Sequence, residues 1–391
     1  MKSSSAPLIA VLALGVFGII TTEIGIVGVL PLVGERFGVS TADAGWLVSV
    51  FALVVAVSGP FTVLLTSGLN RKWVLMGSIA VFAVANFVYA YATDFGWMLT
   101  FRVIPAVVHP VFFAVALATA ARMVSAQEAG KAATRIFAGV TVGFALGVPL
   151  TAYLGSQFSL EAAFLFGSIV NLGAFVGIWI WLPSMPAGRR TSYGSQLGVL
   201  RRPLLWLNLA FIVLIFAAMF STYSYFADYL GQVAKMDGRW VSALLLVFGV
   251  VMVFGNSLFG VLLDRNLIRT VVAFPLVYVG AYALVFAVGS YQVPMVAAIL
   301  IWGTVHSGGL IVSQRYVGLD TADAPEFGNS LFISFSNLGI TAGAALGGWS
   351  ISTVGIRQLP WTGAILAGLA LAVMAVRLVL VRRARLNALV A

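Results

Sequence analysis

The sequence predicts an all-α membrane protein in which twelve transmembrane helices form two pseudo-symmetric six-helix bundles. Three observations carry this prediction: the apolar composition, the number of long apolar segments, and a repeat between the two halves of the chain. Of the 391 residues, 61% are hydrophobic and 9% are charged, whereas soluble domains average about 25% charged residues. A globule of this size cannot bury so much apolar surface, so the solvent of the folded chain must be lipid.

Twelve apolar segments are long enough to span a membrane, which takes about 20 residues in a helix. The first segment begins after Lys2 and continues without a small-residue cleavage site, which favours a retained helix over a removed signal peptide. Tight connections such as 34–43 and 156–159 leave little room for an extramembrane domain. The expected helices are 7–33, 44–67, 72–92, 95–124, 130–155, 160–182, 204–231, 239–263, 269–289, 292–317, 326–354 and 359–381.

One long connector divides these segments six plus six. It covers 183–203, and its content of Pro, Gly, Ser and Arg is typical of a linker. We therefore expect an N-terminal bundle over 1–182, and a C-terminal bundle with a short cytoplasmic tail over 204–391.

The basic residues predict that both termini are cytoplasmic. With the N-terminus inside, seventeen of the 22 Lys and Arg residues fall in cytoplasmic segments or in the tail, where Arg377 is counted. Four fall in outer loops, and Arg102 falls within a span. Because Lys and Arg concentrate on the cytoplasmic side of membrane proteins, this bias accounts for the formal charge of +10 without a nucleic-acid partner.

The two halves repeat one another at three corresponding places. The stretch 66–72 (Thr-Ser-Gly-Leu-Asn-Arg-Lys) follows the second segment, and 260–265 (Gly-Val-Leu-Leu-Asp-Arg) follows the eighth. Glycines recur every four residues over 139–147 in the fifth segment and over 339–347 in the eleventh. The fourth segment ends in Arg-Met-Val and the tenth in Arg-Tyr-Val. Duplicated six-helix halves around a site at mid-membrane are a transporter architecture.

Four segments carry a titratable group within the membrane, where such groups are costly and usually functional. They are Glu23 in the first, Arg102 and His109 in the fourth, Asp228 towards the outer end of the seventh, and His306 in the tenth. Arg102 and His109 are seven residues apart and therefore share a face of one helix. The other eight segments are expected to carry no such group at mid-depth, and this segregation is the strongest functional signal in the sequence.

The chain resembles the major facilitator superfamily over essentially its whole length. Gly260, Asp264 and Arg265 match the superfamily's loop signature, in which an acid and an arginine latch the cytoplasmic ends of helices. In the first-half copy, Asn70 replaces the acid that precedes Arg71. The resemblance implies that these residues hold an inner gate.

Two further motifs resemble those of proton-coupled members of the superfamily. Arg102 resembles the arginine of the helix 4 motif. A glycine ladder followed by a proline resembles the helix 5 signature of the drug:proton antiporters, and it comprises Gly139, Gly143, Gly147 and Pro149. Small residues at this spacing permit close backbone approach, which suits either helices that slide during transport or static packing.

Within the superfamily, three stretches resemble the bacterial sugar-efflux and arabinose-efflux branch of the drug:proton antiporter-1 group. They are 21–23 (Thr-Thr-Glu), 109–113 (His-Pro-Val-Phe-Phe) and 223–228 (Tyr-Ser-Tyr-Phe-Ala-Asp). The branch usually has glycine after the histidine, where this chain has Pro110. The resemblance implies export of sugars, purines or nucleosides, or phenicol-type drugs. It also implies that helices 1, 4, 7 and 10, the four with titratable groups, line a central cavity.

Glu23 is the expected proton carrier. Burial favours its neutral form and a nearby Arg102 favours its charged form, so the carboxyl can load a proton in one conformation and release it in another. The alternatives are a carboxylate that only binds cargo, and a protonated Glu23 that hydrogen-bonds a neighbouring helix. Arg102 is expected to stay charged and to pair with an acid or a backbone carbonyl. Its functional role is that of an electrostatic partner of Glu23 or of the cargo, and the alternative is a fixed strut towards the outer interface. Asp228 is either a second protonation or gating group, or lies at the water interface near Lys235.

Four residues are the expected substrate contacts. His109 could relay protons, donate a hydrogen bond to a polar cargo, or join two helices. His306 is likewise an expected substrate contact, with packing beside Trp302 as its alternative. Tyr223 and Tyr225 offer rings and hydroxyls that suit sugars, nucleobases or aryl drugs, whereas an interfacial aromatic belt is the alternative.

Several function classes are excluded by what the sequence lacks. With no cysteine, disulfides and thiolate metal sites are impossible, and neither histidine has a second ligand at metal-binding spacing. No phosphate-binding glycine loop precedes a Lys-Ser or Lys-Thr pair, so ATP does not drive the protein directly, and no catalytic constellation indicates an enzyme. We expect no cofactor other than the proton that couples transport. The expected partner is a small-molecule substrate, and the protein is expected to be a monomer in the lipid bilayer.

Together these features predict a secondary active efflux transporter of a bacterial inner membrane, which exchanges a small polar or amphipathic solute for protons by alternating access. An uncoupled or importing carrier of the same fold is one alternative. A membrane sensor or scaffold that transports nothing is another.

Overall fold

A computed structural model describes residues 5–66, 68–125, 128–185, 197–322 and 325–390. Within these ranges, twelve helices are long and apolar enough to cross a membrane, and every regular element is helical. Each of the twelve coincides with one of the expected segments. The predicted fold class, an all-α membrane protein with twelve spans, is therefore confirmed.

The helices of the first half begin and end close to the predicted positions. They are α1 (Ser5–Ile24), η1 (Gly25–Gly28), α2 (Leu30–Phe37), α3 (Thr41–Ala44), α4 (Trp46–Thr66), α5 (Arg71–Tyr91), α6 (Phe95–Met123), α7 (Ala129–Val142), η2 (Gly143–Gly147), α8 (Val148–Gln157) and α9 (Leu160–Trp181).

The second half follows the same plan. Its elements are η3 (Leu197–Arg201), α10 (Pro203–Tyr223), α11 (Phe226–Gln232), α12 (Gly238–Arg265), α13 (Leu267–Val288), α14 (Gln292–Asp320), α15 (Pro325–Val354), η4 (Ile356–Gln358) and α16 (Leu359–Val390).

Contacts between residues divide the chain into two compact units. The first comprises Met1–Thr191 with Tyr225–Val250, and the second comprises Ser192–Ser224 with Val251–Ala391. The chain therefore passes between units where α10 ends and α11 begins, and again within α12. Of the linker expected at 183–203, residues 186–196 lie outside the described part of the chain.

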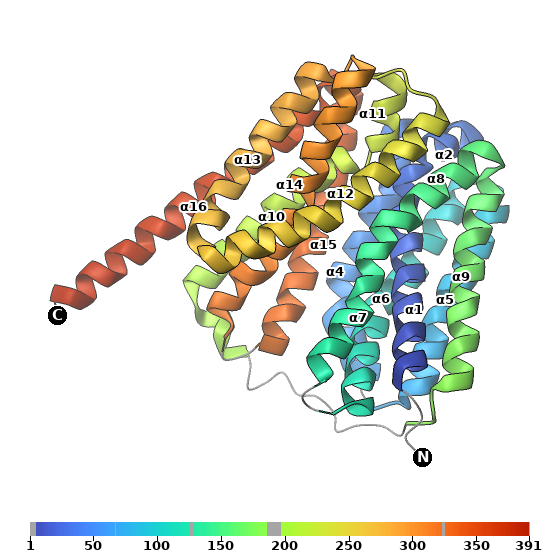
Figure 1. Ribbon diagram of the computed structural model, residues 1–391, viewed down its shortest axis with the longest axis horizontal. Coiled ribbons are helices and arrows are strands. Elements are labelled where there is room, and N and C mark those ends of the chain that lie inside the picture. The colour runs from blue at the N-terminus through green and yellow to red at the C-terminus, as the bar shows by residue number, and fades with distance from the viewer. Residues whose placement is uncertain (1–4, 67, 126–127, 186–196, 323–324, 391) are drawn as a thin grey trace. The chain divides into compact units, whose positions relative to one another are not determined.

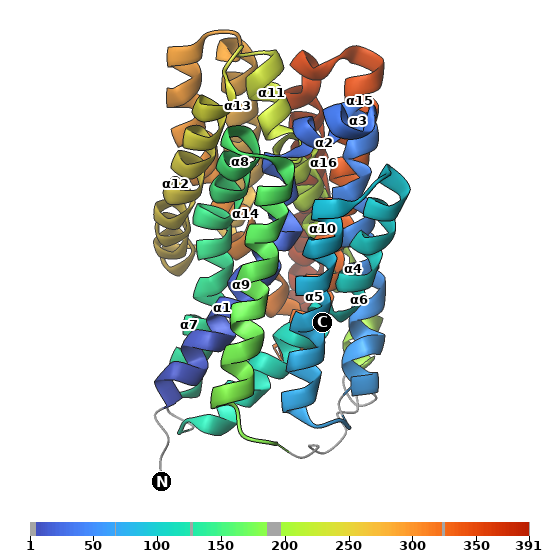
Figure 2. The ribbon, with the colours of Figure 1, turned by 90° about the vertical axis from the view of Figure 1, so that its right-hand side faces the viewer.

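The internal repeat is visible in the packing of the helices. In the first unit α1 packs on α7 and α9, and α5 packs on α6 and α9; Figures 1 and 2 show α1, α7 and α9 side by side. In the second unit α10 packs on α15 and α16, and α13 packs on α14 and α16. These are equivalent pairings in the two halves, as a duplicated six-helix unit requires.

Three predicted segments are interrupted where a single helix was expected. The first changes to 3₁₀ geometry in η1, where α8 approaches so closely that a Cβ on Gly28 would lie 2.8 Å from Ala152 Cβ. The fifth contains the π-helical turn η2, because Pro149 has no N–H to donate to the carbonyl four residues earlier. The seventh breaks at Ser224–Tyr225.

Polar side chains fix the first turns of several helices by accepting a main-chain N–H, which stabilises a helix start by about 1 kcal/mol. Asp94 caps α6, Ser159 caps α9 and Asn266 caps α13. Asn70, which stands where the loop signature has an acid, caps α5, and its amide donates to Ser184 Oγ at 2.8 Å.

Arg377, which the sequence analysis counted with the cytoplasmic tail, is buried in the second unit. It lies within the candidate span of α16 and is 6% exposed. Its Nη2 donates to both carboxylate oxygens of Asp320 at 2.8 and 2.9 Å, and its Nη1 donates to the Tyr316 hydroxyl at 2.8 Å. Asn208 Nδ2 also donates to Asp320 at 3.0 Å. Hydropathy cannot distinguish an inward-facing arginine from an interfacial one, because both interrupt the apolar run equally.

Replacing Arg377 with Met will lower the stability of the protein by about 3–5 kcal/mol, because it leaves the Asp320 carboxylate buried without its partner. The melting temperature of the purified protein in detergent measures this effect. Arg383→Met, an exposed arginine of the same helix, is the matched control and will change little. Equal melting temperatures for the two variants would contradict the expectation.

Candidate functional site

Glu23 and His109 meet inside the first unit. Glu23 is the penultimate residue of α1 and His109 lies in the middle of α6, and Glu23 Oε2 lies 3.0 Å from His109 Nε2. The ring nitrogen is at ion-pair distance but is not aligned for a hydrogen bond. Both side chains are less than a tenth exposed. The rings of Phe51, Phe82 and Phe113 surround the imidazole, with centroids 5.9, 6.5 and 4.8 Å away, so a titratable pair is enclosed by apolar side chains.

The guanidinium of Arg102 donates hydrogen bonds to main-chain carbonyls. Nε donates to Leu47 O at 2.9 Å, Nη1 to Thr22 O at 2.7 Å and Nη2 to Glu23 O at 2.8 Å. The side chain is 1% exposed, and its Cζ lies 4.6 Å from the centroid of the Phe51 ring. It therefore joins α6 to α1 and α4 at the residues that precede η1. This is the strut geometry, with the Glu23 carboxylate near enough for electrostatic interaction.

The two prolines of α6 leave the helix continuous. Pro105 has no N–H for the carbonyl of Phe101, which instead accepts a hydrogen bond from the Tyr89 hydroxyl at 2.8 Å. The ring of Tyr89 also lies 5.9 Å from Arg102 Cζ. Tyr89 thus compensates the proline and contacts the buried guanidinium at once. Pro110, the departure from the branch pattern, does not end the helix.

Asp228 is buried in the first unit, on the short helix α11. It is 3% exposed, and its Oδ1 accepts hydrogen bonds from Thr41 Oγ1 at 3.3 Å and Gln232 Nε2 at 3.4 Å. Its Oδ2 has no hydrogen-bond partner among the described residues. The carboxyl is therefore enclosed by protein, whereas the alternative interpretation placed it at the water interface near Lys235.

Tyr223 and Tyr225 fall in different units, although they are two residues apart. Tyr223 ends α10 in the second unit, and its ring centroid lies 4.8 Å from that of His306. Tyr225 belongs to the first unit, where its hydroxyl lies against Gly45: a Cβ there would overlap the phenol oxygen. Both rings are buried at 1% exposure.

His306 lies in an aromatic cluster of the second unit. Its Nδ1 is 2.8 Å from the Tyr278 hydroxyl, and its ring also contacts Phe220 and Trp302. At 1% exposure it is fully enclosed. These contacts are those of the packing alternative, in which His306 is part of a core beside Trp302.

The loop signature of the second half forms an ion pair within the second unit. Asp264 Oδ1 accepts from Arg315 Nη2 at 3.0 Å, and both side chains are more than half exposed. Arg265 is exposed, and a Cβ on Gly260 would have ordinary space, 3.8 Å from Ile311 Cδ1. The acid thus contacts α14. In the first half, Arg71 begins α5 and its main-chain N–H donates to Met185 O at 3.1 Å.

The glycine ladders pack on the first helix of each half. A Cβ on Gly143 would lie 2.6 Å from Ile20 Cγ2, and one on Gly147 would overlap Thr21 Oγ1. In the second half, a Cβ on Gly343 would lie 2.5 Å from Ala217 O. The ladders therefore bring η2 against α1 and α15 against α10, each within one unit. Pro149 follows the first ladder at the start of α8.

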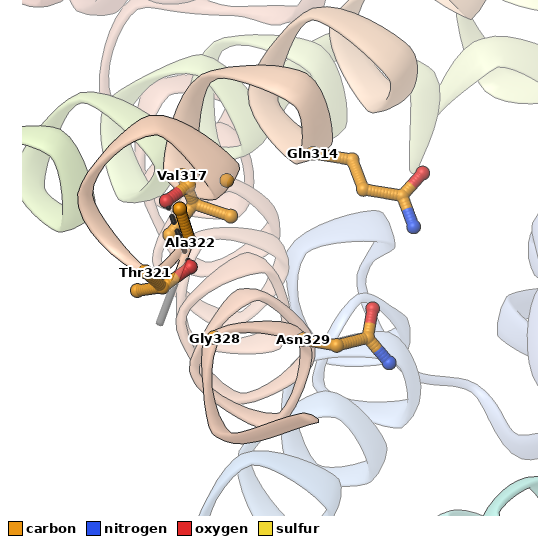
Figure 3. Close-up of a pocket in the computed structure, with 7 residues that line it drawn as sticks. Gln314, Val317, Thr321, Ala322, Gly328 and Asn329 are labelled. Carbon is orange, nitrogen blue, oxygen red and sulfur yellow. Dashed lines mark hydrogen bonds between the residues drawn. The ribbon is translucent and has the colours of Figure 1, made fainter. Parts of the chain in front are cut away.

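A small pocket of about 180 Å³ opens at one end of α14 and α15. Figure 3 shows the amides of Gln314 and Asn329 extending to the same side, while the Thr321 hydroxyl turns back to Val317 O at 3.0 Å. None of the predicted site residues lines it. In the described part of the chain, no group of three His, Asp or Glu side chains could hold a metal ion.

The sequence analysis missed a buried amide network behind Glu23. Asn86 of α5 and Asn171 of α9 both donate to the hydroxyl of Thr22, at 2.7 and 3.2 Å. The search for titratable groups did not include Asn86 and Asn171, because amides do not titrate. The available signal was an asparagine in the middle of each of two apolar segments, because a polar side chain there needs a partner.

Twelve spans in two units, with equivalent helix pairings and a buried polar site behind the first helix, define a membrane transporter. The chain belongs to the Major Facilitator Superfamily, whose family model matches residues 12–326. The predicted family and fold are thereby confirmed.

Comparisons with individual proteins agree with this assignment. The inner membrane transport protein YdhP of Escherichia coli strain K12 is 32% identical over 366 residues, which cover 93% of this chain and 94% of the relative. The chloramphenicol resistance protein of Streptomyces lividans is 30% identical over 373 residues, covering 93% and 94%. Proteins named as probable sugar efflux transporters also match, which bears out the resemblance to that branch.

A solved structure shows the same fold. The crystal structure of a bacterial homologue of the human lysosomal transporter Spinster, in an inward-facing and occupied conformation, superposes with a TM-score of 0.79 at 17% identity. The match covers 96% of this chain and 97% of that one.

Replacing Arg102 with Lys will destabilise the protein, because one ammonium cannot reach three carbonyls on two helices. Each buried carbonyl left without a donor costs about 1–3 kcal/mol. The melting temperature in detergent measures the loss, with Arg122→Lys, an exposed arginine of the same helix, as the control. A melting temperature for Arg102→Lys equal to that of the control would show that the carbonyl contacts do not matter.

Proposed function

We propose that this protein is a proton-coupled efflux transporter of a bacterial inner membrane, with both termini in the cytoplasm. Its cargo is a small polar or amphipathic solute: a sugar, a nucleoside or purine, or a phenicol-type drug. The relatives named for chloramphenicol resistance and for sugar efflux support the phenicol and sugar parts of this range. The excess of basic residues in the cytoplasmic segments supports the orientation.

The contact between Glu23 and His109 is the observation that carries the proposal. A carboxyl and an imidazole 3.0 Å apart, enclosed by three phenylalanine rings, can hold one proton or two, so the charge of the pair changes by one when a proton loads. In a low-dielectric environment such a change alters the interactions of the pair by several kcal/mol. Proton loading can therefore select between two conformations.

Arg102 supplies a fixed positive charge beside this pair. A guanidinium remains protonated at all physiological pH values, and its donors bind the carbonyls of Leu47, Thr22 and Glu23. The charge that changes during transport is therefore that of Glu23 and His109. When Glu23 is ionised it compensates Arg102, and when a proton loads this compensation is lost.

Transport then follows an exchange cycle. Protons from outside load Glu23, with Asp228 as a second group, and leave on the inside after the conformation changes. The proposed cargo contacts are His109 and Tyr225 of the first unit, and Tyr223 and His306 of the second. A proton that moves with the membrane potential releases about 2.3 kcal/mol per 100 mV, enough to sustain a more than tenfold gradient of cargo.

In the same proposal, the loop signatures and the glycine ladder act as gates. The Asp264–Arg315 ion pair is exposed and therefore weak, so it can break and re-form during each cycle. The gating residues are Arg71, Gly260, Asp264, Arg265, Gly143, Gly147 and Pro149.

Glu23→Gln will abolish proton-driven transport and retain the fold, because glutamine has the same shape and cannot titrate. Proteoliposomes with an imposed pH gradient, loaded in turn with arabinose, inosine or chloramphenicol, measure the flux. Glu35→Gln, a matched change near the end of α2, is the control.

Three other outcomes of the flux measurements would each favour a different alternative to the proposed function. Proton-driven flux that persists in Glu23→Gln would make the coupling assignment wrong. Counterflow that is equal with and without the pH gradient in the wild-type protein would indicate an uncoupled carrier. A wild-type protein that moves none of a wider panel of sugars, nucleosides and phenicols would favour a sensor or scaffold.

Asp228→Asn will change the pH profile of transport and keep the protein folded. The amide retains an oxygen that can accept from Thr41, so hydrogen bonding survives while titration is lost. Asp237→Asn is the control, because Asp237 is exposed and caps the neighbouring helix through an oxygen that asparagine also has. An unchanged pH profile in Asp228→Asn would remove Asp228 from the coupling groups.

A further inference from the structure

The amide network behind Glu23 converges on a single hydroxyl. Thr22 Oγ1 accepts from Asn86 Nδ2 at 2.7 Å and from Asn171 Nδ2 at 3.2 Å, and donates to Gly18 O at 2.8 Å. The three polar side chains are 4%, 2% and 0% exposed for Thr22, Asn86 and Asn171. Three helices, α1, α5 and α9, therefore meet at the residue that precedes Glu23.

Two glycines leave the space that the two amides occupy. A Cβ on Gly18 would lie 2.6 Å from Asn171 Oδ1, and a Cβ on Gly167 would lie 2.6 Å from Asn86 Oδ1. Each amide also donates to a carbonyl of its own helix at 2.8 Å. The hydrogen bonds thus hold the amides in fixed orientations, and glycines in α1 and α9 provide the space for them.

Arg102 of α6 holds the same turn of α1 through its main chain. Its guanidinium binds the carbonyls of Thr22 and Glu23, while the amides bind the Thr22 side chain. The two sets of contacts come from different helices and fix both the translation and the rotation of this turn. Because a helix has 3.6 residues per turn, fixing Thr22 also fixes the direction in which the Glu23 side chain leaves the helix.

The electrostatic surroundings of Glu23 come mainly from one helix. His109 and Arg102 of α6 face it, and Tyr89 of α5 lies over the guanidinium. The charged residues of α5, α7 and α9, which pack on α1, lie in the first two turns of those helices: Arg71 and Lys72 in α5, Lys131 and Arg135 in α7, and Glu161 in α9. The short helix α11, which packs on η1, carries Asp228. The span of α4 has no charged residue. A rotation of α1 would therefore change the distance from Glu23 to His109, the titratable side chain that it contacts.

We propose that Asn86 and Asn171 are positioning residues, which hold Thr22 and thereby keep the Glu23 carboxylate against His109. The inference rests on the proposed function, in which this pair carries the coupling proton. Without the amide contacts, α1 rotates within its unit, the 3.0 Å contact lengthens, and the pair binds its proton with a different affinity. The network thus tunes the proton site without itself touching a proton or the cargo.

Thr22→Val tests the proposal, because valine has the shape of threonine and removes only the hydroxyl. Infrared spectroscopy of the full-length protein in lipid nanodiscs follows the protonated carboxyl band against pH, and Glu23→Gln identifies the band. The expected result is a shift of the Glu23 midpoint by about one pH unit, a tenfold change in proton affinity. Asn171→Leu will shift the Glu23 midpoint in the same direction as Thr22→Val does, and Thr22→Ser will restore the wild-type midpoint.

Ser168→Ala is the matched control. Ser168 of α9 donates to Ala83 O of α5 at 2.9 Å, so this variant removes a hydrogen bond between the same two helices and leaves Thr22 untouched. If Thr22→Val and Ser168→Ala lower the melting temperature alike and neither moves the midpoint, the network is merely structural and the proposal is overturned.

A second measurement keeps the positioning claim separate from the proton-coupling claim. The chain has two histidines, so the imidazole ¹⁵N spectrum contains two rings, and His306→Gln assigns them. The His109 Nε2 resonance will move in Thr22→Val and stay in place in Ser168→Ala. If this resonance moves but Glu23 shows no titration, positioning is correct and proton coupling fails; if it does not move, positioning fails whatever the titration shows.

Discussion

A guanidinium buried at 1% exposure holds the first transmembrane helix where its geometry changes. Arg102 meets three carbonyls on two helices, and the faces of Phe51 and Tyr89 cover its charge. A buried charge is tolerated when it is hydrogen-bonded and an opposite charge is near. Here each of the three guanidinium nitrogens donates a hydrogen bond, and the Glu23 carboxylate is close. Since His109 lies on the same helix as Arg102, this one side chain fixes the distance between α1 and α6 that brings Glu23 to the imidazole. The candidate proton site depends on that anchor.

The second unit holds its first helix in an equivalent way without a charge. The Tyr282 hydroxyl of α13 donates to Ala218 O at 2.5 Å, with Met219 O at 3.3 Å, just before the break between α10 and α11. Neighbouring Tyr278 binds His306. The duplicated halves thus share the need to hold a helix near its interruption, but one uses a cation and the other a neutral hydroxyl. A neutral clamp needs no compensating carboxylate, which is consistent with a coupling site in the first unit.

The first helix of each half is also the helix on which the glycine ladder packs. Contacts as close as a Cβ of Gly143 would make with Ile20, or of Gly343 with Ala217, leave little freedom for either helix to slide within its own unit. In the first unit, the amides of Asn86 and Asn171 restrain α1 further. The ladders therefore pack closely on the first helix of each half, and the proton pair lies on a helix that several contacts restrain.

The sequence by itself determined the fold class, because hydropathy and length are properties of each segment alone: it predicted twelve spans, the duplication, and titratable groups on the first, fourth, seventh and tenth helices. It named Glu23 and Arg102 as electrostatic partners and His109 as a substrate contact. Only the tertiary structure decided that Arg102 binds main-chain carbonyls, that His109 is the side chain against Glu23, that two asparagines hold the preceding turn, and that Arg377 points inward to Asp320. Each of these depends on the rotation of one helix against another, and side chains from several helices set that rotation together.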